Sequence, residues 1–334
     1  MQLTPEVLQQ FAETSVEKLV QVDSSIVAAY LCGSTVLPGN PLLGGTTDID
    51  VVLIHTREPR LEREILRLTD DVHLDLCHHT QDIYRQGREL RVHPWMGPTL
   101  NSAKPIYDPR HFLDFTQASV RGLFHRPDYT IQRAQALLDQ ARQTWVGLQS
   151  ISIALGPNVV ASYLKAVENA ANAVAVLEGE PLTERRLLLE FPQRAEKLEY
   201  PRMVIGIMGL LGAHNIGDEQ IRAWVSPWQE SYDAIPEESR PAGLHVYRKD
   251  YYLRVFEAMI DGGEPKAALW PLINSWTLAA SVLSAGNPAY QGWREACQQL
   301  ELLSSNLPEK VAALDAFLDQ VEEVLNQWEQ ESGF

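Results

Sequence analysis

The sequence predicts an α+β protein in which a small domain with a mixed β-sheet is followed by an all-helical domain. Short apolar, β-prone runs occur only in about the first 125 residues. From about residue 128 onward, apolar residues recur at helical spacing and no strand-like run appears. The length of 334 residues favours two domains, which we expect to cover residues 1–127 and 128–334.

The first domain is expected to begin with a helix, because Thr4 and Pro5 form a favourable helix start and apolar residues follow at helical spacing through Val20. Strands are expected at three runs that are apolar or alternate between apolar and polar residues: 25–31, 48–54 and 72–76. Residues 58–70 show helical spacing, which predicts a helix between the second and third strands.

The second domain is expected to consist of helices separated by Gly and Pro. The segments with helical periodicity are 128–151, 158–178, 182–196, 246–261, 265–285, 289–304 and 307–331. Four tryptophans are expected to pack in the core or between helices rather than to stack on a sugar or base: Trp224, Trp228, Trp270 and Trp276.

Charge and cysteine content restrict the functional class. The chain has 28 basic and 44 acidic side chains, a net charge of −16, and no Lys/Arg-rich run, which argues against a long nucleic-acid partner. Residues 128–334 are the more acidic part, with 16 basic against 28 acidic side chains. Three scattered cysteines, the lack of a signal-peptide pattern and the lack of a membrane-length apolar stretch predict a soluble, cytoplasmic protein without a membrane partner.

The segment between Leu31 and Asp75 carries the chemistry. A predicted strand ends at Gly33-Ser34, and after a loop the next strand opens with Asp48-Ile49-Asp50. Side chains alternate along a strand, so Asp48 and Asp50 point to one face, about 7 Å apart along the chain. Paired carboxylates suit hard divalent cations such as Mg²⁺. Asp75 lies in the next strand and joins the pair if that strand is a neighbour.

Gly33-Ser34, Asp48-x-Asp50 and Asp75 together resemble the signature of the DNA polymerase β-like nucleotidyltransferase superfamily. An α/β catalytic domain followed by a helical domain is similar to its aminoglycoside nucleotidyltransferase branch and to related bacterial proteins. The motif resemblance covers about residues 25–80, and the rest is architectural.

The resemblance implies that Asp48, Asp50 and Asp75 bind Mg²⁺ or Mn²⁺ and act in catalysis, while Gly33 and Ser34 hold the triphosphate of ATP or another NTP. The sequence departs from the pattern in two ways. Thirteen residues separate Ser34 from Asp48, a longer loop than usual, and the third acid is Asp where some members have Glu. We expect the carboxylates to be exposed at a cleft, so that replacing Asp48 and Asp50 leaves the fold intact or raises the melting temperature.

Other polar groups admit two interpretations. Lys165 and Arg185 are candidate nucleotide-binding cations, or else part of solvated helix faces. Cys77-His78-His79 could suggest a zinc site, but adjacent residues cannot all converge on one metal, which favours packing at a strand end.

The expected activity is transfer of a nucleoside monophosphate to a hydroxyl of a small-molecule acceptor, with release of pyrophosphate. The similarity to the aminoglycoside nucleotidyltransferase branch implies an aminoglycoside-like acceptor. The acidity near Glu168, Glu178 and Glu180 favours a cationic acceptor. A protein side chain or a tRNA end is an alternative acceptor, and the negative charge counts against tRNA. A further alternative is an interaction module, such as the nucleotidyltransferase-like partner of a toxin–antitoxin pair.

Overall fold

The structure is a computed structural model that describes residues 4–36, 43–149, 155–303 and 307–333. It confirms the predicted α+β class, with a five-stranded mixed sheet in the N-terminal part followed by helices. The chain forms two compact units. The first comprises Met1–Tyr129 and His245–Arg254, and the second comprises Thr130–Leu244 and Val255–Phe334. The boundary expected after residue 127 makes no allowance for His245–Arg254, which returns to the first unit.

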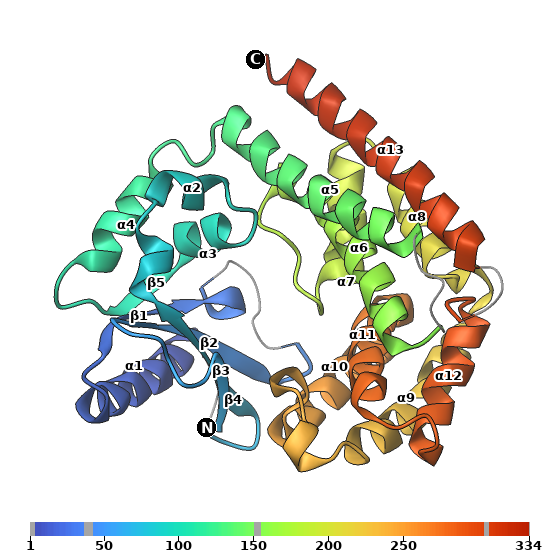
Figure 1. Cartoon of the computed structure of the whole chain (residues 1–334), viewed down its shortest axis with the longest axis horizontal. Helices are drawn as coiled ribbons and strands as arrows, with labels where there is room; N and C mark the ends of the chain where they lie inside the picture. The colour runs from blue at the N-terminus through green and yellow to red at the C-terminus, as the bar shows by residue number, and fades with distance from the viewer. Residues whose placement is uncertain (1–3, 37–42, 150–154, 304–306, 334) are drawn as a thin grey trace. The chain divides into compact units, whose positions relative to one another are not determined.

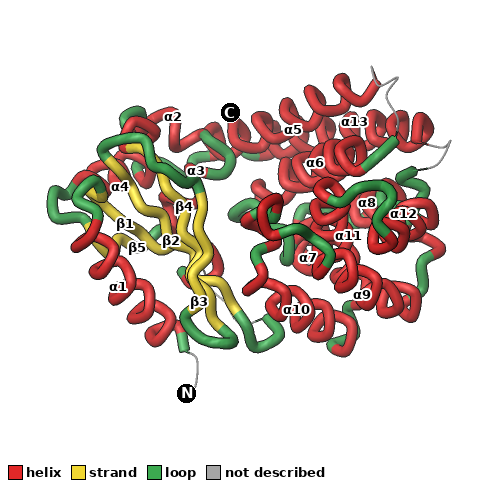
Figure 2. Tube along the Cα trace, turned by 60° about the horizontal axis from the view of Figure 1, so that its bottom comes forward, coloured by secondary structure: helices red, strands yellow, loops and turns green. Residues whose placement is uncertain are grey.

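The first unit is built around the sheet, with strand order β3-β4-β2-β1-β5 (Figures 1 and 2). Only β2 and β4 pair in parallel, and the other neighbours are antiparallel. The strands are β1 (Ile26–Cys32), β2 (Thr47–His55), β3 (Arg63–Arg67), β4 (Val72–Thr80) and β5 (Lys104–Tyr107). The helices of this unit are α1 (Pro5–Val22), α2 (Gly87–Val92), α3 (Met96–Ser102) and α4 (Phe112–Arg121).

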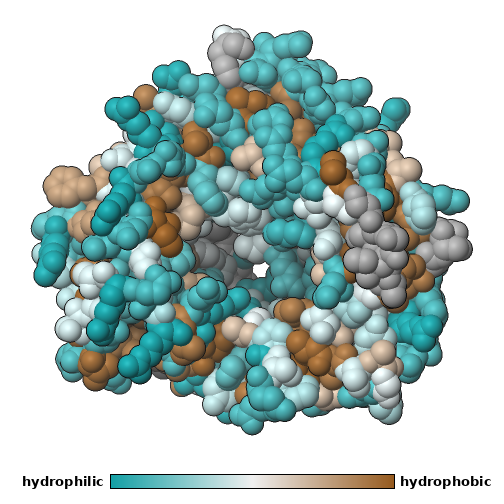
Figure 3. Space-filling model, viewed as in Figure 1, coloured by the Kyte–Doolittle hydropathy of each residue, from teal (hydrophilic) through white to brown (hydrophobic). Residues whose placement is uncertain are grey.

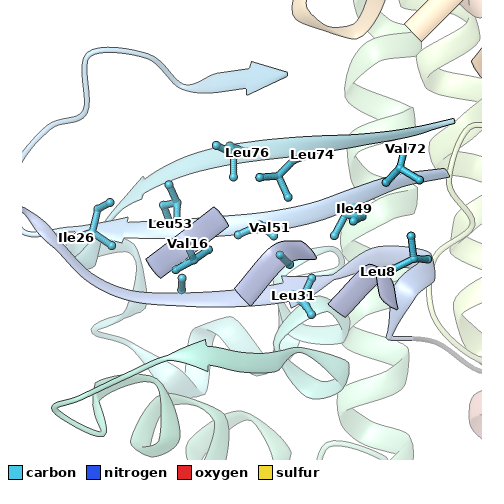
Figure 4. Close-up of a cluster of buried hydrophobic side chains, with 12 residues drawn as sticks. Leu8, Val16, Ile26, Leu31, Ile49, Val51, Leu53, Val72, Leu74 and Leu76 are labelled. Atoms are coloured by element: carbon cyan, nitrogen blue, oxygen red, sulfur yellow. The ribbon is translucent and has the colours of Figure 1, made fainter. Parts of the chain in front are cut away.

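Each face of the sheet is covered by helices, as Figure 1 shows. The α1 helix, capped by Thr4 as expected, packs on one face. Figure 4 shows the apolar side chains of this core, among them Leu8, Val16, Leu31, Val51 and Leu74. On the opposite face, β1 and β2 pack against α2, α3 and α4 through residues that include Tyr30, Ile54, Leu90, Leu100 and Leu113. Because strand side chains alternate, the residues of β2 and β4 that lie between those of the α1 core point to this second face.

The helix predicted for residues 58–70 is wrong. Residues Arg63–Arg67 form strand β3, which pairs antiparallel with β4, and Ile65 lies opposite Asp75. The strand is short and only its central residue is fully buried. Its apolar spacing fits a helix equally well, and pairing with β4 decides the conformation.

Among its described residues, the second unit contains helices and no strand. Its helices are α5 (Pro127–Gln149), α6 (Pro157–Ala175), α7 (Leu187–Lys197), α8 (Arg202–Leu210), α9 (Asp218–Asp233), α10 (Lys249–Asp261), α11 (Pro265–Val282), α12 (Pro288–Gln299) and α13 (Leu307–Glu331). The first residues of α5 and α10 belong to the first unit. The expected helix ends at residues 150–151 and 304 lie outside the described residues.

The four tryptophans pack in the interior of this unit, as predicted. The indole N–H of Trp228 donates to the Ser275 hydroxyl at 2.9 Å, and that of Trp276 donates to the Ser231 hydroxyl at 2.7 Å. For Trp228 and Trp276, burial together with a satisfied donor fits a structural role in the core.

Among the described residues, no helix has both the length and the apolar character needed to cross a membrane. On the face shown in Figure 3, hydrophilic residues predominate and hydrophobic residues appear in small groups.

Candidate functional site

The three predicted carboxylates lie on one face of the sheet. Asp48 and Asp50 belong to β2, and Asp75 belongs to the adjacent parallel strand β4. In the strand register Asp50 is the partner of Asp75, and Asp48 is the partner of His73. The sequence predicts that Asp75 joins the pair if its strand neighbours that of Asp48 and Asp50. The structure shows that the two strands are neighbours. Its strand is not an edge strand, because β3 covers its other side.

Gly33 and Ser34 lie beside these carboxylates, in a short 3₁₀ turn (Gly33–Thr35) that follows β1. Cys32, the last residue of β1, is the register partner of Asp50. Gly33 has φ +67°, and a Cβ atom placed on it would lie 2.1 Å from Oδ2 of Asp50. Only glycine accommodates both the left-handed backbone and the adjacent carboxylate. The Ser34 hydroxyl is buried and has no hydrogen-bond partner in the described part of the chain.

Asp75 is held by an arginine from β3. The Arg63 Nε donates to Oδ1 of Asp75 at 2.8 Å, and an η-nitrogen of Arg63 donates to Oδ2. This bidentate hydrogen bond is the main reason that the pKa of Arg63 is raised. Asp75 is 2% exposed, so its charge is compensated by Arg63 rather than by water.

Asp48 is also buried, at 2% exposure, and pairs with an arginine that is distant from it in the sequence. An η-nitrogen of Arg248 lies 2.7 Å from Oδ2 of Asp48. The expectation that Asp48 and Asp50 are exposed is therefore wrong for Asp48, whereas Asp50 is partly exposed. The physical reason is the pair of arginines, which compensates the two buried charges.

His73 completes this end of the sheet. Its Nδ1 lies 3.7 Å from Oδ1 of Asp48, and burial lowers the pKa of His73 despite the nearby carboxylate. His73 is therefore neutral at neutral pH, and the cationic charge around Asp48 comes from arginine.

Buried polar atoms without hydrogen bonds gather at this site. Among the described residues, they include Oγ of Ser34, both carboxylate oxygens of Asp48 and Nδ1 of His73. The Asp48–Arg248 contact is close, but it lacks the geometry of a hydrogen bond. Buried polar groups are nearly always satisfied, so such a group of atoms marks a place that suits water or another polar partner.

The carboxylate oxygens have the chemistry that Mg²⁺ or Mn²⁺ prefers, and the unsatisfied oxygens of Asp48 fit such a cation. However, no three acidic, His or Cys side chains of the described segments are already arranged around one metal position. Two of the three carboxylates are engaged by Arg63 and Arg248. A cation at Asp48 would therefore lie beside the guanidinium of Arg248.

The remaining sequence candidates belong to the second unit. Lys165 belongs to the second unit, where its ammonium group pairs with Glu168 at 2.7 Å. Arg185 precedes α7 in the same unit and is half-buried. A role for Lys165 and Arg185 in nucleotide binding stays a prediction. The Ser34–Asp48 loop lies partly outside the described residues, at positions 37–42.

The side chains of Cys77, His78 and His79 have different neighbours, as a packing role requires. Cys77 packs against the core beneath α2–α4, where burial raises its pKa to about 11 and keeps the thiol protonated. Nδ1 of His78 lies 3.0 Å from Nε2 of His55, whereas Nδ1 of His79 lies 2.7 Å from the Tyr84 hydroxyl.

A second polar network occupies the carboxyl ends of β2 and β4, at the opposite end of these strands from the carboxylates. The Ser25 hydroxyl lies 2.9 Å from Nδ1 of His55, whose Nε2 faces His78. These residues line a pocket of about 500 Å³. Burial lowers the pKa of both His55 and His78, so the pair is neutral at neutral pH.

Arg63 and Arg248 are not among the residues that the sequence predicts for this site. The helix expected for residues 58–70 conceals Arg63, because only a strand places it beside Asp75 of the next strand. Arg248 lies in a segment predicted to belong entirely to the helical domain, and the printed sequence contains no signal that connects it to Asp48.

Neither a scan against protein-family models nor a search of curated proteins gives a match for this chain. A functional proposal therefore depends on its own residues and their geometry.

Proposed function

We propose that this protein is a nucleotidyltransferase. With Mg²⁺ or Mn²⁺ it would transfer a nucleoside monophosphate, from ATP or another NTP, to a hydroxyl of a small-molecule acceptor and release pyrophosphate. The observation that carries the proposal is the placement of Asp48, Asp50 and Asp75 on one sheet face beside the Gly33-Ser34 turn.

The residues have distinct roles in this proposal. Asp50 and Asp48 would hold the divalent cations, with Asp75 as the third carboxylate. When bound, such cations neutralise the phosphates and favour ionisation of the attacking hydroxyl. Gly33 allows a phosphate to approach the backbone, and the buried Ser34 hydroxyl has a hydrogen bond to donate to it.

The acceptor would be a cationic small molecule, for example a polyamino sugar. Support comes from the net charge of −16 and the excess of acids in residues 128–334. A tRNA acceptor suits this charge poorly, and a protein side chain remains the alternative.

No disulfide joins the three cysteines, which supports a cytoplasmic setting.

A second candidate function is a nucleotidyltransferase-like binding module, such as the partner of a toxin. The observation that favours it is the pairing of Asp75 with Arg63 and of Asp48 with Arg248, which leaves the site nearly neutral without a metal. The orphaned Ser34 hydroxyl and the partly exposed Asp50 favour the enzyme.

The two functions differ in pyrophosphate release. We would incubate the protein with Mg²⁺, labelled NTPs and a panel of cationic and neutral acceptors. The enzyme predicts acceptor-dependent release that is lost in Asp50→Asn and retained in Asp82→Asn, whose exposed carboxylate pairs with the nearby Arg85. Release that persists unchanged in Asp50→Asn would exclude this site as the catalytic one.

A further inference from the structure

Arg248 reaches the carboxylates from a part of the chain far from them in sequence. It ends a 3₁₀ turn (Val246–Arg248) that leads into α10, and only 8% of the residue is exposed. Its guanidinium lies 2.7 Å from Asp48, 5.0 Å from the ring centre of Tyr251 and 5.7 Å from that of Tyr252. These contacts hold the guanidinium in one position.

The rest of the segment His245–Arg254, here called the Arg248 segment, is also bound to the first unit. The ring of Tyr247 stacks on His73 with the ring planes 9° apart and the centroids 6.2 Å apart. Arg254 forms an ion pair with Asp71, directly before β4. The backbone carbonyl of Arg254 lies so near Gly44 that a Cβ there would approach within 2.4 Å of it. The segment is therefore attached at several points, not by Arg248 alone.

The charge of Arg248 opposes the binding of a metal at Asp48. The guanidinium of an arginine stays protonated at any physiological pH, and that of Arg248 lies 2.7 Å from Oδ2 of Asp48. A divalent cation bound to Asp48 would lie in direct contact with this guanidinium. Both cations compete for one buried carboxylate.

We propose that the Arg248 segment locks the candidate site in its metal-free state, and that metal binding at Asp48 requires Arg248 to leave. This inference rests on the proposed metal-dependent function of the same carboxylates. Arg63 is a weaker competitor, because its side chain is 38% exposed and its partner is Asp75. With the lock in place, the apparent metal affinity equals the intrinsic affinity multiplied by the fraction of molecules in which Arg248 is released.

Manganese binding tests the lock without any measurement of catalysis. Free Mn²⁺ would be titrated by electron paramagnetic resonance, and the binding lost in Asp50→Asn would be assigned to this site. Arg248→Met keeps an unbranched side chain and removes the charge, so the variant should bind Mn²⁺ about tenfold more tightly than the wild type, or more tightly still. Arg222→Met is the control, because Arg222 forms an exposed pair with Asp261 in the second unit, and it should leave the affinity unchanged.

Hydrogen–deuterium exchange of the wild-type protein covers the case in which Arg248→Met does not fold. Saturating Mn²⁺ should increase the exchange of residues 245–254. If Mn²⁺ binds in an Asp50-dependent way but leaves this exchange unchanged, the lock is overturned and the metal site is retained. Equal Mn²⁺ affinities of the wild type and a folded Arg248→Met variant would have the same meaning. Absence of Asp50-dependent binding in the wild type and the variant would overturn the lock together with the proposed metal-dependent function.

Discussion

Gly33 is constrained both by its backbone and by the Asp50 carboxylate. We expect Gly33→Ala to lower the melting temperature and to weaken ATP binding, because the added methyl group displaces the carboxylate. Gly45→Ala is a matched control, since Gly45 has φ +73° and no atom within 4 Å of the added Cβ. It should show only the backbone cost, about 1 kcal/mol. Thermal unfolding and calorimetry measure both effects, and equal losses in the two variants would contradict the contact with Asp50.

Asp48 and Asp50 should differ in their contribution to stability. Asp48→Asn leaves Arg248 buried without a compensating charge, so the free energy of unfolding should fall by about 3 kcal/mol. Asp50→Asn should cost much less, because Asp50 is partly exposed. Urea unfolding gives both values. An Asp48→Asn variant as stable as the wild type would show that the ion pair does not stabilise the fold.

The sequence predicts some residues of the site and not others for a physical reason. Asp48, Asp50 and Gly33 are readable because local spacing along a strand and a turn determines where their side chains point. Arg248 is not readable, because its contact with Asp48 depends on how the chain returns to the first unit. The burial of the carboxylates could not be predicted without the arginines.

Among the structural elements, those with strong local signals are predicted and those fixed by partners are not. The α1 helix has its Thr4 cap, and α13 has a long apolar stripe, so both are where the sequence places them. The β3 strand lacks such a signal and depends on its pairing with β4. The α9 helix was not expected, although its buried side chains include Trp224 and Trp228.

His55 and His78, at the carboxyl ends of β2 and β4, should make the stability of the fold depend on pH. The pKa values of His55 and His78 lie below the ordinary value of 6.5 because burial disfavours the charged forms. The neutral pair therefore stabilises the fold fully above about pH 6.5, and this contribution is lost as the pH falls through the lowered pKa values. His78→Asn, whose amide can replace Nδ1, should lose less stability than the wild type between pH 7.5 and pH 5.5. Unfolding curves of both proteins at the two pH values measure this loss. Equal losses in the variant and the wild type would contradict this account.

At the scale of the whole molecule, the net charge of −16 should favour cationic acceptors. We expect a polyamino sugar to bind more tightly than a neutral sugar, and added salt to weaken its binding. Glu168→Gln should reduce the affinity, whereas Glu309→Gln, at the exposed start of α13, should not. Calorimetry at two salt concentrations tests this, and indifference to ligand charge and salt would leave the acidity as a surface property.

The central claim is that Asp48, Asp50 and Asp75 form a cation-dependent nucleotide site. It is tested most directly by calorimetric titration of the protein with ATP, in the presence of Mg²⁺ and in the presence of EDTA. Carboxylates and a triphosphate repel each other unless cations lie between them. We predict binding with Mg²⁺ that disappears in EDTA and in Asp50→Asn. Equal ATP affinity in Mg²⁺ and in EDTA would contradict the claim.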